Sequence, residues 1–278
     1  MRKLLGALLL LSTLQSAALI AAERNDLGSC YDKANLSEYK PTPSGRQLVI
    51  VIDQTVRMPE DLQRSAWDSI TRFIQPGDQV KLYSFSAFVP GEYIRLLTDI
   101  TLDKPISEKI RNTVSRTRLR TLDSCLKQQQ QQFIAVVGGQ FVNALRSASE
   151  ELPRSEIMHA LREIGHDMQR QTAQERIVFL ISDMLENSDY TSFYANNRIR
   201  DLNLDRELQL ADKQALYANL QGARVYVSGA GVVTSNIKHS YRSSKTMDKL
   251  NQFWDEYFKR SEAQLEGFGM PMLNMELR

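Results

Sequence analysis

Two short apolar runs constrain the fold of this chain more than any other feature, because each of them leads into an aspartate. Residues 47–52 (QLVIVI) precede Asp53, and residues 176–182 (RIVFLIS) precede Asp183. Continuous apolar runs of this length are typical of strands buried on both faces of a parallel sheet. Because ligands bind outside the carboxyl ends of such strands, we expect Asp53 and Asp183 at the functional edge of a sheet.

The remaining segments predict an α/β fold class. Alternating apolar residues predict an edge hairpin from residues 79–88 and 91–99, and residues 223–231 predict another strand. Apolar residues at helical spacing predict helices at residues 59–74, 105–119, 121–151, 155–168, 204–220 and 246–265. We therefore expect a doubly wound, mostly parallel sheet with helices on both faces, one antiparallel edge hairpin and a long helical insertion at about residues 105–152.

The N-terminus indicates export. Two basic residues precede an apolar run at residues 4–11, and the small residues Ala21 and Ala22 follow it. This pattern predicts a secretory signal peptide over residues 1–22, with no membrane attachment after cleavage. The alternative is a membrane anchor, but the strongly apolar part is short for a spanning helix of about 20 residues.

Composition and flanking segments add further expectations. The 278 residues can form one large α/β domain or two small ones. The net charge is only +2 and no long Lys/Arg block occurs, so nucleic-acid binding has no electrostatic support. The polar residues 23–46 predict a tail or linker before a domain at residues 47–265, and residues 266–278 are expected to form a C-terminal tail.

The chain has two cysteines, Cys30 and Cys125. In an oxidising compartment two cysteines usually pair, so we expect a disulfide between them. The alternative is two separate buried thiols, because a sequence does not show proximity.

Five stretches, taken in order, resemble the von Willebrand factor A (vWA) family. They are LVIVIDQTVRM, IQPGDQVKLYSFS, RSEIMHALREI, RIVFLISDMLENS and ARVYVSGAG. The resemblance covers roughly residues 47–262 and implies a strand-end metal site that serves adhesion. In that family hydroxyls bind a hard Mg²⁺ ion directly, the aspartates act mostly through water, and a partner carboxylate takes the open position.

Four residues of this chain match that implied metal site by their chemistry: Asp53, Thr55, Ser155 and Asp183. Arg57 stands where the family has a further hydroxyl, and arginine has only donors and stays protonated. Either the Arg57 side chain turns inward and pairs with one of the aspartates, or it turns outward and leaves a weakened site. We expect no cofactor or a weakly bound Mg²⁺. Loop and helix capping is the alternative role for Thr55 and Ser155.

The leading hypothesis is an exported, non-enzymatic protein–protein interaction module of a bacterial cell envelope, either periplasmic or secreted. Its partner would be another envelope or secreted protein that binds at the rim of the degenerate strand-end site. The polar loop after Asp183 carries Tyr190, Phe193 and Tyr194, which we expect to add aromatic contact area.

Two alternatives remain. A haloacid-dehalogenase-like, Mg-dependent phosphohydrolase would use Asp53 as nucleophile and Asp183 as a metal ligand. That family has a second aspartate where this chain has Thr55, and no well-placed lysine is evident. A purely structural envelope component with a vestigial site is the other possibility.

Overall fold

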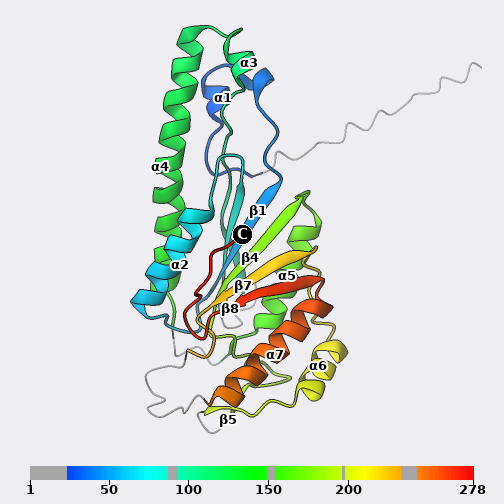
Figure 1. Ribbon diagram of the computed structural model, residues 1–278. Helices are drawn as coiled ribbons and strands as arrows, with labels where there is room; N and C mark the ends of the chain where they lie inside the picture. Colours follow the sequence, from blue (N-terminus) through cyan, green and yellow to red (C-terminus); the bar gives the residue numbers. More distant parts are fainter. Residues whose placement is uncertain (1–23, 87–92, 150–153, 196–197, 233–242) are drawn as a thin grey trace, which may run out of the picture.

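One six-stranded sheet organises the chain (Figure 1). The computed structural model describes residues 24–86, 93–149, 154–195, 198–232 and 243–278, so the expected signal peptide lies outside the described residues. The strands of this sheet are β1 (Arg46–Asp53), β2 (Gln79–Phe85), β3 (Ile94–Thr101), β4 (Glu175–Ile181), β7 (Ala223–Ser228) and β8 (Ala263–Phe268).

The strand order is β3-β2-β1-β4-β7-β8. All neighbouring pairs are parallel except β2 and β3, which form the antiparallel edge hairpin. If only the six strands of this sheet are numbered in chain order, their order is 3-2-1-4-5-6, as in doubly wound folds. In such folds ligands bind at the carboxyl ends of the strands. The fold class expected from the sequence is confirmed.

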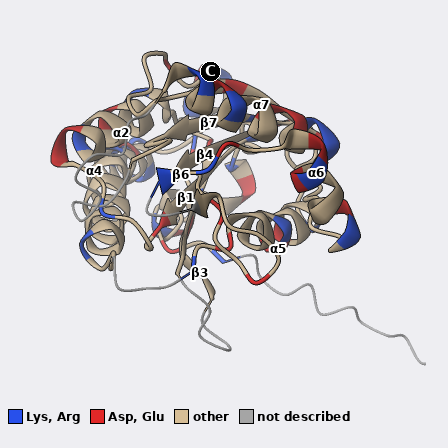
Figure 2. Ribbon diagram, turned by 90° about the horizontal axis from the view of Figure 1, so that it is seen from below, with Lys and Arg blue, Asp and Glu red and all other residues tan. Residues whose placement is uncertain are grey.

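Helices cover both faces of the sheet (Figure 2). The long helices are α2 (Glu60–Phe73) and α4 (Arg116–Arg146) on one face, and α5 (Ile157–Gln169), α6 (Leu204–Lys213) and α7 (Ser244–Arg260) on the other. The short elements are α1 (Cys30–Lys33), η1 (Ser37–Tyr39), α3 (Glu108–Arg111), β5 (Tyr194–Ala195) and β6 (Arg198–Ile199). Within the described ranges, no helix is both long and apolar enough to cross a membrane.

The long helical insertion is present as α4, which has 31 residues. The Ser115 side chain caps it by accepting a hydrogen bond from the Arg118 amide. Phe133, Val137 and Phe141 are buried against the sheet face that α2 also covers. The prediction of one helix over residues 105–119 is wrong, because α3 is the only helix in residues 105–115. Helix α4 then begins at Arg116 rather than at residue 121.

Two predicted helices end earlier than expected. Helix α6 ends at Lys213 and α7 ends at Arg260, whereas apolar spacing extended them to residues 220 and 265. In both cases a residue with positive φ follows, Ala215 at 51° and Glu262 at 52°, so the chain leaves the helix in a left-handed conformation. After Glu262 the chain forms β8, a parallel strand that the sequence did not reveal.

The C-terminal segment is not a free tail as predicted. Leu273 and Leu277 are buried in the core on the α2 side of the sheet. The Tyr226 hydroxyl donates a hydrogen bond of 2.9 Å to the Arg278 carbonyl oxygen. Residues 269–278 therefore belong to the packed fold.

A buried charge lies inside the edge hairpin. The Lys81 side chain, on β2, is 3% exposed and pairs with Asp99 at 3.1 Å and with Asp167 at 2.8 Å. The alternating pattern of β2 is typical of a strand with a solvated face, but helix α5 covers that face and supplies Asp167. Because both carboxylates contact the ammonium group, the buried charge is compensated.

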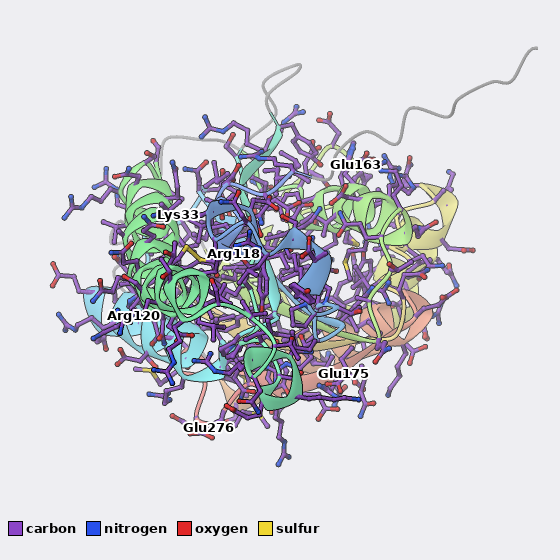
Figure 3. All side chains as sticks on the ribbon, turned by 90° about the horizontal axis from the view of Figure 1, so that it is seen from above. Lys33, Arg118, Arg120, Glu163, Glu175 and Glu276 are labelled. Atoms are coloured by element: carbon purple, nitrogen blue, oxygen red, sulfur yellow. A yellow bond between two sulfur atoms is a disulfide. The ribbon has the colours of Figure 1, made fainter. Side chains whose placement is uncertain are left out.

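The segment before β1 is also packed, so the predicted tail or linker is wrong. Tyr31 and Leu36 are fully buried beside Leu122 of α4. Cys30 of α1 and Cys125 of α4 form the expected disulfide, with their Cα atoms 5.5 Å apart (Figure 3). This bridge attaches the N-terminal segment to the insertion.

Removing the disulfide should destabilise the protein measurably. For a cross-link with a sequence separation of 95 residues, the chain-entropy argument gives a loss of roughly 4 to 5 kcal/mol in the free energy of unfolding. We expect the Cys30→Ser/Cys125→Ser variant to unfold at a clearly lower urea concentration than the oxidised wild type. Reduced wild type is the matched control and should behave like the variant. Equal urea midpoints for all three forms would contradict this account.

Candidate functional site

The carboxylate of Asp53 is the centre of the candidate site. It lies at the end of β1, is fully buried and accepts four hydrogen bonds. Its Oδ1 accepts from the Thr55 amide at 2.9 Å and from the Thr55 hydroxyl at 2.6 Å. Its Oδ2 accepts from the Ser182 hydroxyl at 2.7 Å and from the Ser155 hydroxyl at 3.2 Å. One carboxylate thus joins three separate segments of the chain.

The second aspartate, Asp183, follows β4 and is also buried. Its Oδ1 accepts a hydrogen bond from the Leu185 amide at 2.9 Å, and its Oδ2 accepts from the Tyr194 hydroxyl at 2.8 Å. Met184, which lies between Asp183 and Leu185 in the sequence, has a φ of 59°, an unfavourable backbone conformation for a residue with a side chain. Its amide donates to the Ser182 hydroxyl, and its carbonyl accepts from the Trp254 indole at 2.8 Å. These contacts hold the strained turn in place.

Burial changes the acid–base behaviour of both carboxyl groups. It raises the pKa of Asp53, although the hydrogen bonds from Thr55, Ser182 and Ser155 oppose the shift. Burial and the nearby charge of Asp53 together raise the pKa of Asp183 well above its usual value. The two aspartates are therefore close enough to repel each other, and a bound proton relieves that repulsion.

Arg57 does not neutralise this pair. Its side chain is exposed, and its Nε donates a hydrogen bond of 3.3 Å to the Ala148 carbonyl oxygen. Within the described part of the chain it forms no ion pair, with either aspartate or with any other carboxylate. Of the two orientations considered for Arg57, the structure therefore has the outward one.

The structure brings together the four residues that match the family pattern. Thr55 and Ser155 both contact Asp53 through their hydroxyls, and Asp183 lies beside it. Capping does not explain Ser155, because Glu156 occupies the N-cap position of α5 and the Ser155 hydroxyl donates to Asp53 instead. Ser155 instead pairs with the backbone of Asn187, which lies in the loop after Asp183.

This arrangement is a poor fit for a tightly held Mg²⁺ ion. Mg²⁺ requires a nearly complete octahedron of oxygen ligands. Arg57 supplies no oxygen at the position where the family has a further hydroxyl, so the ligand set that the resemblance implies is incomplete. In the described part of the chain, no group of three or more Asp, Glu, His or Cys side chains is arranged to hold a metal ion.

The three aromatic residues of the following loop point into the protein. Phe193 is fully buried and packs edge-on against Phe253, with ring centroids 5.0 Å apart. The prediction that its side chain contacts a partner is wrong, because the side chain is part of the core under α7. Tyr190 and Tyr194 are partly buried, and their hydroxyls donate to Glu186 and Asp183, respectively. All three residues fix the loop.

Sequence reasoning missed Ser182 and Glu186. Ser182 directly precedes Asp183 at the end of β4, so a hydroxyl next to a strand-end aspartate was an available signal. Glu186 is a fully buried carboxyl group that accepts hydrogen bonds from the Met158 amide at 3.0 Å and the Tyr190 hydroxyl at 2.7 Å. Burial raises the pKa of Glu186 to about 7. No local pattern marks a glutamate in a polar loop as buried.

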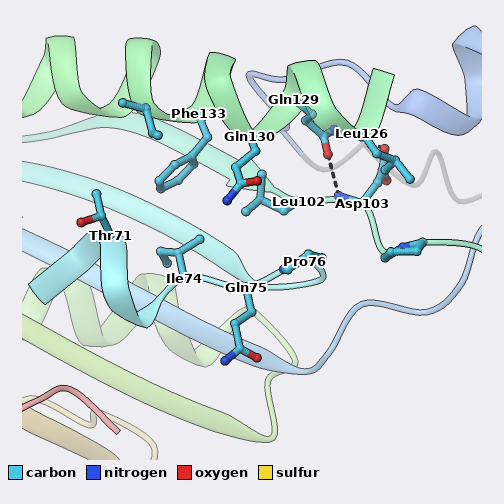
Figure 4. Close-up of a pocket in the computed structure, with 12 residues that line it drawn as sticks. Thr71, Ile74, Gln75, Pro76, Leu102, Asp103, Leu126, Gln129, Gln130 and Phe133 are labelled. Carbon is cyan, nitrogen blue, oxygen red and sulfur yellow. Dashed lines mark hydrogen bonds between the residues drawn. The ribbon is translucent and has the colours of Figure 1, made fainter. Parts of the chain in front are cut away.

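A separate cavity of about 90 Å³ lies between α2 and α4 (Figure 4). Its lining includes Ile74, Leu102, Leu126 and Phe133. Gln129 borders it and accepts a hydrogen bond of 2.9 Å from the Asp103 amide. The lining of this small cavity is mostly apolar.

No protein-family model and no curated protein matches the chain. The comparison with solved structures found distant similarities. The vWF domain of the type V pili tip protein Mfa5 from Porphyromonas gingivalis is 19% identical with a TM-score of 0.28, over 52% of this chain and 39% of that one. The pilus adhesin SpaC from Lactobacillus rhamnosus GG is 13% identical with a TM-score of 0.33, over 78% of this chain and 27% of that one. An aerotolerance-related membrane protein from Bacteroides fragilis is 13% identical with a TM-score of 0.32, over 78% of this chain and 88% of that one.

The first two of these chains are much longer than the parts that align, since this chain spans 39% and 27% of their lengths. The strand order, the antiparallel edge hairpin and the two strand-end aspartates are more informative than these distant alignments. The chain has a vWA-like fold. The resemblance seen in the sequence is confirmed at this level.

Restoring the missing hydroxyl should strengthen metal binding. We expect wild type to bind Mg²⁺ or Mn²⁺ weakly in calorimetry, and Arg57→Ser to bind more tightly. The substitution supplies an oxygen ligand and removes a positive charge from the loop, and a positive charge near the site repels a divalent ion. Arg57→Ala is the control, since it removes the cation without adding an oxygen. Tight binding by wild type that Arg57→Ser leaves unchanged would contradict the prediction.

Glu186 should make stability depend on pH. Because its pKa in the folded protein is raised, the folded state binds its proton more tightly than the unfolded state does. Its contribution is therefore complete below the unfolded pKa and is lost as pH rises towards about 7. We expect Glu186→Gln to remove about 3 kcal/mol of the fall in unfolding free energy between pH 4.5 and 7.

Urea unfolding across that pH range measures this effect. The matched control is Glu276→Gln, because the Glu276 side chain is 80% exposed. That variant should show the same fall in unfolding free energy with pH as wild type. If Glu186→Gln also shows the wild-type fall, the Glu186 carboxyl group is not protonated in the folded protein.

Proposed function

We propose that the protein is an exported, non-enzymatic interaction module of the cell envelope that binds another protein at the rim of its strand-end site. The observation that carries this proposal is the closed hydrogen-bond network around Asp53. It fixes the loops after β1 and β4 and the segment before α5 in one arrangement. A rigid set of loops at the carboxyl edge of the sheet is a suitable platform for a partner.

The contact surface in this proposal is the exposed rim rather than the buried carboxylates. Arg57 is exposed there, and Arg154 pairs with Asp189 at 2.6 Å beside the Ser155 segment. The guanidinium of Arg57 is suited to a carboxylate of the partner, because planar arginine donors match carboxylate oxygens. In this proposal Arg57 takes the recognition role that a bound metal has in the vWA family.

The hydrogen bonds of Asp53 argue against the phosphohydrolase alternative. A nucleophilic carboxylate has to reach the substrate, whereas Asp53 is fully buried and both of its oxygens accept hydrogen bonds. A phosphatase assay with p-nitrophenyl phosphate and Mg²⁺ separates these ideas. Turnover that Asp53→Asn abolishes would favour the enzyme.

The location in the cell envelope is part of the same proposal. The Cys30–Cys125 disulfide supports an oxidising compartment, because such bridges persist in secreted and periplasmic proteins. A structural envelope component remains the second candidate, and it differs from the first in having no partner that depends on the rim.

Charge reversal on the rim should abolish partner binding without unfolding the protein. We expect an Arg57→Glu variant, used as bait in envelope extracts, to lose at least one protein that wild type captures, as measured by quantitative mass spectrometry. Arg118→Glu is the matched control, because Arg118 is an exposed arginine on the first turn of α4, at the end of the molecule seen in Figure 3. Identical captured sets for all three baits would favour the structural alternative.

A further inference from the structure

The charges of this chain are unevenly distributed. Residues 104–127 hold seven basic and two acidic residues, a net charge of +5, whereas the whole chain has a net charge of only +2. This stretch forms α3 and the first turns of α4, at the end of the molecule that projects beyond the sheet (Figure 1). Figure 3 is a view onto this end. Its exposed basic residues, which we call the basic tip, are Lys33, Lys109, Arg116, Arg118 and Arg120.

Helix stability does not account for the arginines of the basic tip. No acidic residue lies in the first turn of α4, where Arg116 and Arg118 are placed. The positive end of the helix dipole disfavours cations at this position, and Arg116 and Arg120 repel each other as like charges four positions apart. Arg111 pairs with Asp123 at 2.7 Å, and in the described part of the chain none of the three tip arginines forms an ion pair.

We propose that the basic tip binds the anionic headgroups of a lipid membrane, so that the protein attaches to a membrane surface through this end. Guanidinium groups match phosphate oxygens in both geometry and charge, and clusters of basic residues are attracted to anionic lipid surfaces. The contact is peripheral and reversible, so it differs from the membrane anchor considered for the N-terminus.

The composition of the tip favours a lipid surface over an acidic protein as the partner. Protein interfaces usually have an apolar or aromatic core. None of the notably exposed large apolar side chains of the described residues lies within residues 104–127; they are Ile134, Val136, Val142 and Met270. The tip therefore offers charge without an apolar anchor, which suits binding to headgroups without insertion. For the same reason we expect binding to weaken as salt is added.

Helix α4 separates the basic tip from the strand-end rim. At the C-terminal end of α4, the Gln54 side chain donates a hydrogen bond of 2.9 Å to the Ala144 carbonyl oxygen, and the Ser149 amide donates one of 2.9 Å to the Gln54 carbonyl oxygen. This end therefore lies beside the loop after β1. The 31 residues of α4 span about 46 Å. A membrane bound at the tip leaves the rim accessible, and the inference shares the envelope location of the proposed function but not the role of the rim.

Co-sedimentation of the mature, oxidised protein with lipid vesicles tests the proposal. We expect wild type to bind vesicles that contain phosphatidylglycerol but not vesicles of phosphatidylcholine alone, and to be released by salt. The Arg116→Gln/Arg118→Gln/Arg120→Gln variant should bind the anionic vesicles roughly a hundredfold more weakly, because each basic residue near such a surface raises the affinity about fivefold. Far-UV circular dichroism confirms that the variant is folded.

The matched control removes three exposed arginines elsewhere. The Arg64→Gln/Arg146→Gln/Arg206→Gln variant has the same net charge as the tip variant and should bind the vesicles like wild type. Arg57→Glu should also bind them like wild type, which separates this test from that of the rim. Because the tip binds lipid, an Arg118→Glu bait still captures the proteins that bind the rim. Equal weakening in both triple variants overturns the proposal, as does a wild type that binds neither kind of vesicle.

A fluorescent label on α4 tests which end meets the membrane. Cys30 and Cys125 are the chain's two cysteines and are joined to each other, so an introduced cysteine is its only free thiol. Labels at the exposed positions of Thr117→Cys and Ser147→Cys are about 45 Å apart along the helix. With vesicles whose headgroups carry a spin label, we expect quenching of the Thr117→Cys label and not of the Ser147→Cys label. Equal quenching of both, or of the second alone, overturns attachment through the tip.

Discussion

The hydrogen bonds of one buried carboxylate hold the functional edge of this protein together. Asp53 accepts them from Thr55, Ser155 and Ser182, which come from three segments far apart in the sequence. Hydrogen bonds to a charged group contribute about 1.5 to 3 kcal/mol each, and leaving the carboxylate unpaired would cost more. The positions of the loops after β1 and β4 therefore depend on this group. So does the strained turn at Met184, because Ser182 contacts both Asp53 and the Met184 amide.

The second aspartate is held by hydrogen-bond donors of the chain itself. Asp183 and Asp53 repel each other in a buried setting, and some positive charge or proton has to compensate. The Arg57 side chain faces solvent, and the Tyr194 hydroxyl contacts the Asp183 oxygen instead. The raised pKa of Asp183 favours a proton at this position. A hydroxyl and a proton can therefore compensate the two carboxyl groups without Arg57.

Much of this arrangement could be predicted from the sequence, and the reasons are physical. The runs before Asp53 and Asp183 are buried on both faces, so their composition alone identified β1 and β4 and placed the aspartates at one edge. Helix α4 could likewise be predicted despite its run of glutamines, because Phe133, Val137 and Phe141 keep helical spacing. The inward direction of Phe193 and the burial of Glu186 could not be predicted, since both depend on contacts with α5 and α7. The end of α7 was missed because Leu265 continues its apolar spacing, although the helix has already ended.

We propose that hydrogen bonds within the chain, rather than a bound metal ion, fix the strand-end loops. Amide hydrogen exchange of wild type in EDTA and in excess Mg²⁺ tests it most directly, with the Thr55, Met184 and Leu185 amides as reporters, since each donates to a group of this network. The account predicts slow exchange at all three amides and equal rates in the two buffers. Protection that appears only when Mg²⁺ is present would contradict it, because a metal ion would then be the group that organises the site.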